Sequence, residues 1–268
     1  MGSDSCGAAL HTPIGVFDSG VGGLSILKAL RAALPRENFV YLADTGHAPY
    51  GERGDAYVIE RTRAIVRQLR DEHAIKALVM ACNTATAAAI HLVREENPGL
   101  TVVGVEPALK PAVALSRTRR IGVLATRSTL ASGKFQALRA VLKEQAEFVL
   151  QPCDGLAGAI ENHDGRGIAQ LCASYVQALG ELGCQAGQID TVVLGCTHYA
   201  FAQAELAVRA GPGVRLLETG VPVARQARRL LEAAGQLRPA GAGGVNFLST
   251  GSLHALQAAA ARWLGLAI

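Results

Sequence analysis

Short runs of apolar residues alternate along this chain with longer segments in which apolar side chains recur every three to four residues. The short runs are rich in Val, Ile and Leu, as expected for strands of a parallel sheet that is covered on both faces. The longer segments have the periodicity of helices. This alternation predicts an α/β fold with strands at 14–18, 39–43, 77–81, 102–105, 121–125, 147–150, 191–195, 214–217 and 245–248.

Helices are expected in the segments between these strands. Pro222 and Ser252 support two of the helix starts, because proline is favoured in the first turn of a helix and serine just before it. The predicted helices cover 24–33, 56–72, 84–95, 133–143, 167–182, 202–209, 222–234 and 253–264.

The two halves of the chain resemble each other. Residues 14–17 (IGVF) return as 121–124 (IGVL), 107 positions later, and residues 78–84 return as 192–198, 114 positions later. These similar offsets indicate a duplication with small insertions. We therefore expect two similar lobes, each a mostly parallel sheet flanked by helices.

Each copy of the later element carries a cysteine directly after its strand, Cys82 in the first half and Cys196 in the second. Open parallel sheets bind ligands at the carboxyl ends of their strands. We expect the two lobes to face each other across a cleft, with one of these cysteines on each side of it.

Length and composition narrow the class of protein. The 268 residues correspond to one or two domains of roughly 150 residues. A composition of 50% hydrophobic and 18% charged residues excludes a disordered chain, collagen and a coiled coil.

The six cysteines form neither a disulfide scaffold nor the paired spacing of a zinc module, so we expect free thiols in a reducing cytoplasm and no metal. Residues 1–13 lack the features of a secretory signal, and the weakly charged stretch 77–93 is too polar for a membrane span.

The charge balance is mild, with 26 basic and 22 acidic residues and a formal net charge of +4. The densest basic cluster, residues 117–120, has no aromatic residues among its arginines, which favours a solvated turn over a nucleic-acid surface. We therefore expect no nucleic-acid partner. A weak positive field would suit a small anionic substrate.

The matched pair Cys82 and Cys196 suggests a particular chemistry. A single cysteine at a strand end is usually a small buried hydrophobe, whereas a thiol at the start of a helix has its thiolate favoured by the helix dipole. Two such groups on opposite faces of a carbon acid can remove a proton from one side and deliver one to the other. This pattern favours inversion of a stereocentre over two structural thiols.

The glycine-rich turn at residues 18–23 follows the first strand and has two interpretations. Gly20 and Gly22 begin a dinucleotide-binding fingerprint, with Asp44 at the distance of a ribose-binding acid, but Ser25 replaces the third glycine. Asp18 would also place a negative charge where a pyrophosphate must sit. A carboxylate here fits better as a proton partner of a thiol or as the acceptor of a substrate ammonium, while Ser19 and helix-start amides would hold a carboxylate.

Other titratable residues lie near the two strand ends. His198 is adjacent to the second thiol and would tune it or relay protons to it; a zinc site is the weaker alternative because no paired ligand spacing supports it. Glu161 is either an exposed acid at a helix end or a second proton relay, and its position alone favours the exposed acid. Residues 44–51 form a turn-rich loop at the ligand-binding end of the sheet.

Five motifs in order give the chain a resemblance to a known family. They are residues 14–24 (IGVFDSGVGGL), 48–51 (APYG), 81–86 (ACNTAT), 104–108 (GVEPA) and 194–199 (LGCTHY). Together they resemble the glutamate racemases of the cofactor-independent aspartate/glutamate racemase superfamily over nearly the whole chain.

The resemblance implies two-base racemisation of glutamate without a cofactor, with Cys82 taking the α-proton of the D enantiomer and Cys196 that of the L enantiomer. It further implies that Asp18 assists Cys82, that His198 assists Cys196, and that Glu161 is a family acid near the second site. The positions that would hold the ammonium and carboxylate groups of the substrate are Asp18, Ser19, Tyr50, Gly51, Asn83, Thr84, Thr197 and His198.

The resemblance also implies a discontinuous first lobe, 12–106 plus 218–268, a second lobe over 107–217, a homodimer, and D-glutamate supplied for peptidoglycan synthesis in the cytoplasm. His198 fits the glutamate-specific pattern, whereas Ala200 departs from a common family proline.

None of the lysines has the context of a lysine that binds a cofactor. Each falls in a segment whose pattern predicts a solvated helix face or turn: Lys28, Lys76, Lys110, Lys134 and Lys143.

Three other functions fit parts of the pattern. An aspartate or related amino-acid racemase would use the same two thiols. A non-catalytic two-lobed module would bind an amino acid in the expected cleft. A nicotinamide oxidoreductase would rest only on the glycine turn and Asp44.

Overall fold

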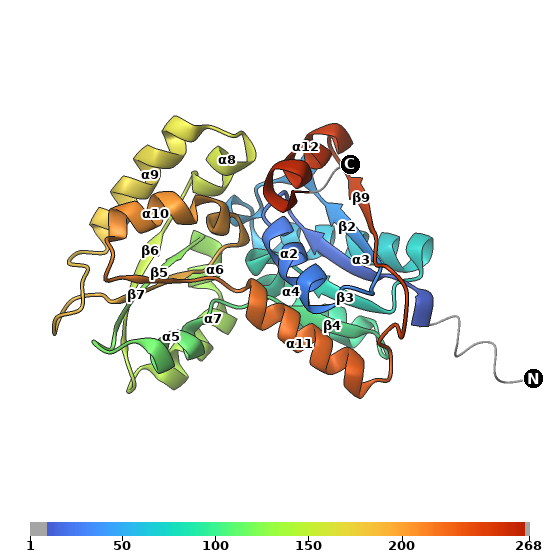
Figure 1. The fold of residues 1–268 in the computed structure, drawn as a ribbon, viewed down its shortest axis with the longest axis horizontal. Coiled ribbons are helices and arrows are strands. Elements are labelled where there is room, and N and C mark those ends of the chain that lie inside the picture. The colour runs from blue at the N-terminus through green and yellow to red at the C-terminus, as the bar shows by residue number, and fades with distance from the viewer. Residues whose placement is uncertain (1–9, 266–268) are drawn as a thin grey trace, which may run out of the picture. The chain divides into compact units, whose positions relative to one another are not determined.

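The computed structural model describes residues 10–265, which form two compact units (Figure 1). The first unit contains the described residues up to Tyr50, then Gly54–Val105 and the chain from Gly220 on. The second contains Gly51–Arg53 and Glu106–Thr219. Each unit is built on its own sheet, and every paired strand in both sheets is parallel, which confirms the predicted α/β class.

The sheet of the first unit has five strands in the order β4-β3-β1-β2-β9. Helices cover both of its faces: α2 packs against α11 and α12, and α3 packs against α4 (Figure 1). The strands are β1 (Ile14–Asp18), β2 (Phe39–Ala43), β3 (Ala77–Met80), β4 (Thr101–Gly104) and β9 (Val245–Ser249). The helices are α2 (Leu24–Ala33), α3 (Asp55–His73), α4 (Asn83–Glu96), α11 (Gly220–Ala233) and α12 (Leu253–Leu264), with the short 3-10 helix η1 (Thr45–His47) after β2.

The sheet of the second unit has four strands in the order β6-β5-β7-β8. They are β5 (Arg120–Ala125), β6 (Glu147–Pro152), β7 (Thr191–Leu194) and β8 (Arg215–Leu217). The helices of this unit are α5 (Leu109–Leu115), α6 (Arg127–Ala131), α7 (Gly133–Leu142), α8 (Leu156–Glu161), α9 (Gly165–Ala178) and α10 (Gln203–Ala210), with η3 (Thr197–Ala202) before α10. In a further 3-10 helix, η2 (Tyr50–Glu52), Tyr50 belongs to the first unit and the next two residues to the second.

The internal repeat is confirmed by the topology of the two sheets. The order β4-β3-β1-β2 in the first sheet corresponds to β8-β7-β5-β6 in the second. The register corresponds too, because Gly15 pairs with Leu78 in the first sheet and Gly122 pairs with Val192 in the second. Cys82 and Cys196 therefore follow the same strand of the repeat, β3 in one unit and β7 in the other.

Alternation along the strands of the second unit divides its core between the two faces of the sheet. Leu124 and Leu194 pack with residues of α8, α9 and η3 on one face. Val123 and Val193 pack with residues of α5 and α7 on the other. Burial on both faces explains why these strands read as continuous apolar runs instead of alternating ones.

Several helices depart from the sequence prediction. The short helices α5, α6 and α8 are not predicted, because segments of five to seven residues hold too few turns for a clear apolar period. The predicted helix 167–182 ends at Ala178, and Gly180 follows with a φ of +92° that leaves the helical conformation. Ser252 caps α12 as predicted, accepting a hydrogen bond from Ala255 N at 3.1 Å.

Lys76 contradicts the expectation of a solvated lysine. Its side chain is 2% exposed and its Nζ lies 2.6 Å from Glu37 Oε2. It also donates to the backbone carbonyls of Leu10 and Gln236. A buried ammonium needs such a complete set of partners, and it connects the strand β3 to the segment between α11 and β9.

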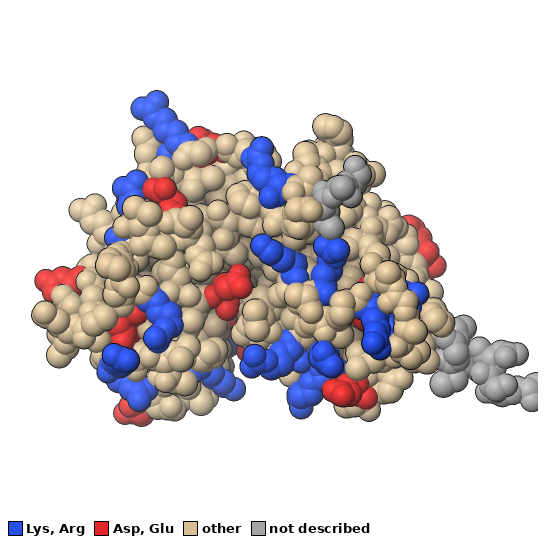
Figure 2. Space-filling view, in the orientation of Figure 1, with Lys and Arg blue, Asp and Glu red and all other residues tan. Residues whose placement is uncertain are grey.

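Lys and Arg side chains on the face shown in Figure 2 are spread singly or in small groups among uncharged residues and acids. Within residues 10–265, no helix is long and apolar enough to cross a membrane. No group of three or more His, Cys, Asp or Glu side chains in that same range is arranged to hold a metal ion.

Candidate active site

Three adjacent strands of the first unit end in polar residues at the same edge of the sheet. Strand β3 leads to Cys82, β1 ends at Asp18, and β2 leads to Asp44. Backbone hydrogen bonds continue the sheet past the strand ends: Ala81 N donates to Phe17 O at 2.7 Å, and Asp44 N donates to Asp18 O at 2.9 Å. The three polar residues are thus held in a fixed order at the ligand-binding edge of a parallel sheet.

Cys82 occupies the N-cap of α4. Its backbone is extended, its sulfur accepts a hydrogen bond from Ala85 N at 3.4 Å, and its side chain is buried with 5% exposure. The thiol also donates toward Ser19 Oγ at 3.8 Å. A sulfur that caps a helix experiences the positive end of the helix dipole, which favours its thiolate form.

Asp18 is fully buried, and its Oδ2 accepts a hydrogen bond from Gly23 N at 2.5 Å. Gly23 is the N-cap of α2, and a Cβ at this position would lie 2.6 Å from Asp18 Cβ. The glycine-rich turn therefore serves the close packing of the helix start against a carboxylate. This argues against the nucleotide cradle, because the aspartate already takes the helix amide that a pyrophosphate would need.

Asn83 begins α4 and is 3% exposed. Neither its amide nitrogen nor its amide oxygen has a hydrogen-bond partner among the described residues. A buried amide without partners is costly, so this side chain is suited to a polar ligand. Thr84, the next residue, is also buried.

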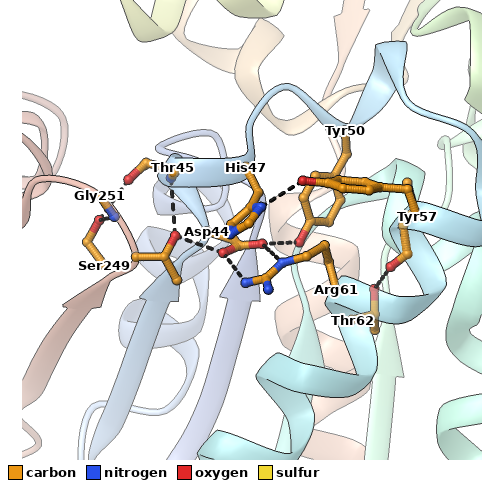
Figure 3. A network of polar contacts seen from close by, with 12 residues as sticks. Asp44, Thr45, His47, Tyr50, Tyr57, Arg61, Thr62, Ser249 and Gly251 are labelled. Carbon is orange, nitrogen blue, oxygen red and sulfur yellow. Dashed lines mark hydrogen bonds and ion pairs between the residues drawn. The ribbon is translucent and has the colours of Figure 1, made fainter.

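Asp44 is the centre of a polar network beside this edge of the sheet (Figure 3). Its carboxylate accepts hydrogen bonds from Tyr50, Arg61 and Thr250. Burial alone would raise the pKa of Asp44, but these hydrogen bonds, with that from Arg61 first, hold it below its usual value. Because its oxygens are occupied, Asp44 is not available to a ribose, which removes the remaining support for a nicotinamide site.

Tyr50 is 1% exposed and its hydroxyl points at Asp44 (Figure 3). Burial, and then the hydrogen bond to this carboxylate, raises the pKa of Tyr50. The side chain of Tyr50 is therefore occupied by contacts within the protein, and only its backbone groups can bind a ligand.

Gly51 belongs to the second unit and packs against Thr126, where a Cβ would lie 2.9 Å from Thr126 Cγ2. Its carbonyl accepts a hydrogen bond from Ser128 Oγ at 2.7 Å. The sequence gives no sign of this contact with the start of α6, because it joins segments 77 positions apart.

The second unit brings Cys196, His198 and Glu161 into one chain of polar contacts. Cys196 Sγ lies 3.7 Å from His198 Nδ1, and His198 Nε2 lies 2.5 Å from Glu161 Oε1. Burial alone would lower the pKa of His198, but the neighbouring Cys196 and Glu161 raise it well above its usual value. A protonated His198 would donate to both the thiolate and the carboxylate.

Glu161 differs from the favoured expectation of an exposed acid at a helix end. It does end α8, but its side chain is 17% exposed and faces His198. The proton-relay interpretation is the one that fits this geometry. Thr197, between the thiol and the imidazole, is 4% exposed.

The remaining described cysteines have environments unlike those of Cys82 and Cys196. Cys153 and Cys172 are buried in the apolar core of the second unit, where desolvation raises the pKa of both, that of Cys172 to about 11. Cys184 is exposed. Cys6 lies outside the described residues.

Comparisons with known proteins agree with this picture. A family model described as Asp/Glu/Hydantoin racemase matches residues 14–227. A glutamate racemase of Ralstonia pickettii is 46% identical over 257 residues, covering 95% of this chain and 89% of the relative. Among solved structures, a glutamate racemase of Bacillus anthracis superposes with a TM-score of 0.86 at 30% identity, covering 96% of each chain. One of Francisella tularensis, solved with D-glutamate, superposes with a TM-score of 0.81 at 25% identity, covering 97% of this chain and 96% of its own.

Proposed function

Because the chain belongs to the Asp/Glu/hydantoin racemase family and is an amino-acid racemase, we propose that it interconverts L- and D-glutamate by two-base proton transfer between Cys82 and Cys196. The observation that carries the proposal is the repeated strand end. The same strand of each sheet leads into a thiol, β3 into Cys82 and β7 into Cys196. A duplicated acid/base group is what inversion at a single carbon requires.

The reaction moves one proton off Cα and another onto it. In the D-to-L direction, the Cys82 thiolate takes the α-proton, forming an S–H bond as the C–H bond breaks. The Cys196 thiol then gives its proton to the opposite face of the carbon and becomes a thiolate. In the L-to-D direction the two cysteines exchange these parts, so each must reach both protonation states.

The first thiol has Asp18 and Ser19 as its supporting groups. The Cys82 sulfur is 3.8 Å from Ser19 Oγ and accepts the amide of Ala85, which favours the thiolate. Asp18 is buried one position before Ser19, with a helix amide fixing its carboxylate. A carboxylate in this place supports binding of the substrate ammonium and transfer of protons to and from Cys82.

The second thiol has His198 and Glu161. A cationic imidazole 3.7 Å from Cys196 stabilises the thiolate formed when this cysteine donates its proton. Glu161 on the other ring nitrogen keeps the imidazole protonated and oriented. The two thiols thus use different partners for the same task.

Substrate binding is assigned to the polar side chains at the two strand ends. The amide of Asn83 and the hydroxyls of Ser19, Thr84 and Thr197 are placed among buried groups, where hydrogen bonds to a carboxylate are strong. Such bonds stabilise the negative charge that develops as the α-proton leaves. With both proton transfers supplied by cysteines, the proposed reaction needs no pyridoxal phosphate.

The product D-glutamate fits a role in peptidoglycan synthesis and cell shape, as the family resemblance implies. We place the reaction in the cytoplasm, because two catalytic thiols must stay reduced. We also propose a homodimer, which light scattering after size exclusion would test.

The direct test is a cofactor-free assay by circular dichroism at a fixed wavelength with L-glutamate, D-glutamate and L-aspartate as separate substrates. The proposal expects both glutamate enantiomers to lose their optical signal toward the racemic mixture, with aspartate turned over far more slowly. Turnover of aspartate alone would move the function to an aspartate racemase. Glutamate binding by calorimetry without any loss of optical activity would indicate a binding module instead.

A further inference from the structure

The segment that carries Tyr50 and Gly51 is fixed by a side chain to which no role in this reaction has been assigned above. We propose that Asp44 is a positioning residue for substrate binding, acting through the buried hydroxyl of Tyr50 to set the backbone of residues 50–51. This inference rests on the proposed function, because the resemblance gives that backbone a place in holding glutamate.

The first support is the orientation of Tyr50. Its side chain is 1% exposed, and its hydroxyl donates to Asp44 Oδ2 at 2.5 Å. Its ring also packs against the ring of Phe17, the residue before Asp18, with the two ring centroids 6.2 Å apart. A tyrosine held at both its ring and its hydroxyl has no side-chain atom left for a ligand, but it fixes the backbone that leads into Gly51.

The second support is the completeness of the set of donors around Asp44 (Figure 3). Its Oδ2 accepts from Arg61 Nε at 3.0 Å as well as from Tyr50, and its Oδ1 accepts from Arg61 Nη2 at 2.9 Å and from Thr250 Oγ1 at 2.8 Å. The carboxylate is fully buried, and each of its two oxygens accepts two hydrogen bonds. A bidentate arginine fixes the orientation of a carboxylate as well as neutralising its charge. Asp44 therefore offers the hydroxyl of Tyr50 an acceptor that is held in one orientation.

The third support is the place of Asp44 in the sheet. Its backbone amide donates to Asp18 O, and Ala43 O accepts from Thr250 N at the end of β9. Asp44 is therefore joined to β1, β9 and α3 at once, and β1 carries Asp18, the proposed proton partner of Cys82. Tyr50 is close enough to Cys82 for a thiolate there to contribute to the raised pKa of Tyr50.

This role predicts a separation between KM and kcat. A backbone that binds substrate and transition state alike contributes to KM, whereas kcat stays near its original value when that contribution weakens. Loss of structure has the opposite signature, because a smaller folded fraction lowers the apparent kcat and leaves KM unchanged. The two parameters therefore distinguish positioning from mere structural support.

The experiment measures KM and kcat for both glutamate enantiomers in Tyr50→Phe, Asp44→Asn and Arg61→Lys. Tyr50→Phe keeps the packed ring and removes only the hydroxyl, so this variant still tests the proposal if Asp44→Asn does not fold. We expect KM to rise about tenfold in Tyr50→Phe and Asp44→Asn, the size of a hydrogen bond to a charged group, with kcat changed less than twofold. The double variant of Tyr50→Phe and Asp44→Asn should have a KM no higher than that of the worse single variant, because both substitutions affect the one contact between Tyr50 and Asp44.

Two matched controls lie in the same region. Tyr57→Phe removes a hydroxyl that contacts His47 Nδ1 at 2.7 Å instead of Asp44, and Arg63→Lys alters the exposed arginine two positions after Arg61 that pairs with Glu96. Both should keep the original KM.

An unchanged KM in Tyr50→Phe and Asp44→Asn overturns the inference, whether or not kcat falls. If the original protein binds glutamate without racemising it, the proposed function has failed. The Kd from calorimetry then replaces KM in the same comparison, so the two failures are distinguishable.

Discussion

His198 Nε2 lies 2.5 Å from Oε1 of Glu161, a residue 37 positions earlier in the chain. The contact is partly buried, with the histidine side chain 6% and the glutamate side chain 17% exposed. It gives the imidazole next to Cys196 a charge partner on its far side. The pair determines the protonation state in which His198 meets the thiol.

Replacing Glu161 with Gln should lower the pKa of His198. Gln keeps the size and the hydrogen bond but removes the negative charge that raises this pKa above the ordinary value of 6.5. A titration of the His198 ring by NMR measures it. The basic limb of the pH profile for racemisation should move to lower pH by the same amount, because the imidazolium that supports the Cys196 thiolate is lost earlier.

The same substitution has a defined effect on stability. A histidine with a raised pKa in the folded state contributes stability fully below its unfolded pKa of about 6.5, and this contribution disappears as the pH rises through the folded pKa. The loss of unfolding free energy in Glu161→Gln should therefore be largest in mild acid just below about pH 6.5 and shrink as the pH rises above it, as measured by urea unfolding. Glu205→Gln, which alters a surface pair with Arg209, serves as the control; an equal pH dependence in both variants would contradict the assignment.

Removing either candidate thiol should reduce racemisation about a hundredfold or more in both directions. The reason is that abstraction by one cysteine in one direction is donation by the same cysteine in the other. Cys82→Ala and Cys196→Ala are compared by circular dichroism with Cys184→Ala, whose exposed thiol lies outside both sites. Near-normal turnover in either of the first two variants would show that its thiol is not an acid/base group.

Asn83→Ala should weaken substrate binding without destabilising the fold. The amide is buried and has no hydrogen-bond partner among the described residues, so its removal relieves a desolvation cost and deletes a group suited to the substrate. We expect KM for glutamate to rise roughly three- to tenfold, and Tm to stay level or increase. Asn97→Ala is the contrast, because the side chain of Asn97 is hydrogen-bonded to Arg70 and to Val93 O. This substitution should lower Tm and leave KM unchanged. A lower Tm with an unchanged KM in Asn83→Ala would give that residue a structural role instead.

Gly23→Ala should damage both the fold and the first thiol site. An added Cβ would lie 2.6 Å from Asp18 Cβ and 2.8 Å from the hydroxyl of Tyr41, an overpacking that costs about 1–3 kcal/mol. Gly54→Ala tests the same change at another helix N-cap, where no atom lies within 4 Å, and should shift stability by no more than about 0.5 kcal/mol. Unfolding in urea measures both; equal losses would mean that the packing around Asp18 tolerates the methyl group.

The apolar pattern predicts most of the fold because the central strands of both sheets, β1, β2, β3, β5 and β7, are buried on both faces. Runs such as 14–18 and 191–194 are recognisable without a partner strand, and the repeat of 14–17 at 121–124 predicts the shared topology. Short helices escape this reading. Helix α6 begins after Thr126, which caps it by accepting a hydrogen bond from Thr129 N at 3.2 Å. Its five residues are too few to show a helical period of apolar side chains.

The candidate site divides in the same way. Cys82, Cys196 and His198 are adjacent to strand ends, so their place at the ligand-binding edge follows from the strand pattern and from local sequence. The contacts that Glu161 and Asp44 make do not follow from it. Their partners, His198 and Arg61, reach them through the packing of α8 on η3 and of α3 on the sheet, which no local signal encodes.

The central claim is that two cysteines exchange protons with opposite faces of one carbon, and solvent labelling tests it most directly. L-glutamate is converted in deuterium oxide, and the first few per cent of reaction is examined by mass spectrometry with the enantiomers separated. Because the donating thiol carries solvent deuterium, the account predicts deuterium at Cα in the D-glutamate formed and none in the L-glutamate recovered. D-glutamate that retains the original proton would contradict it.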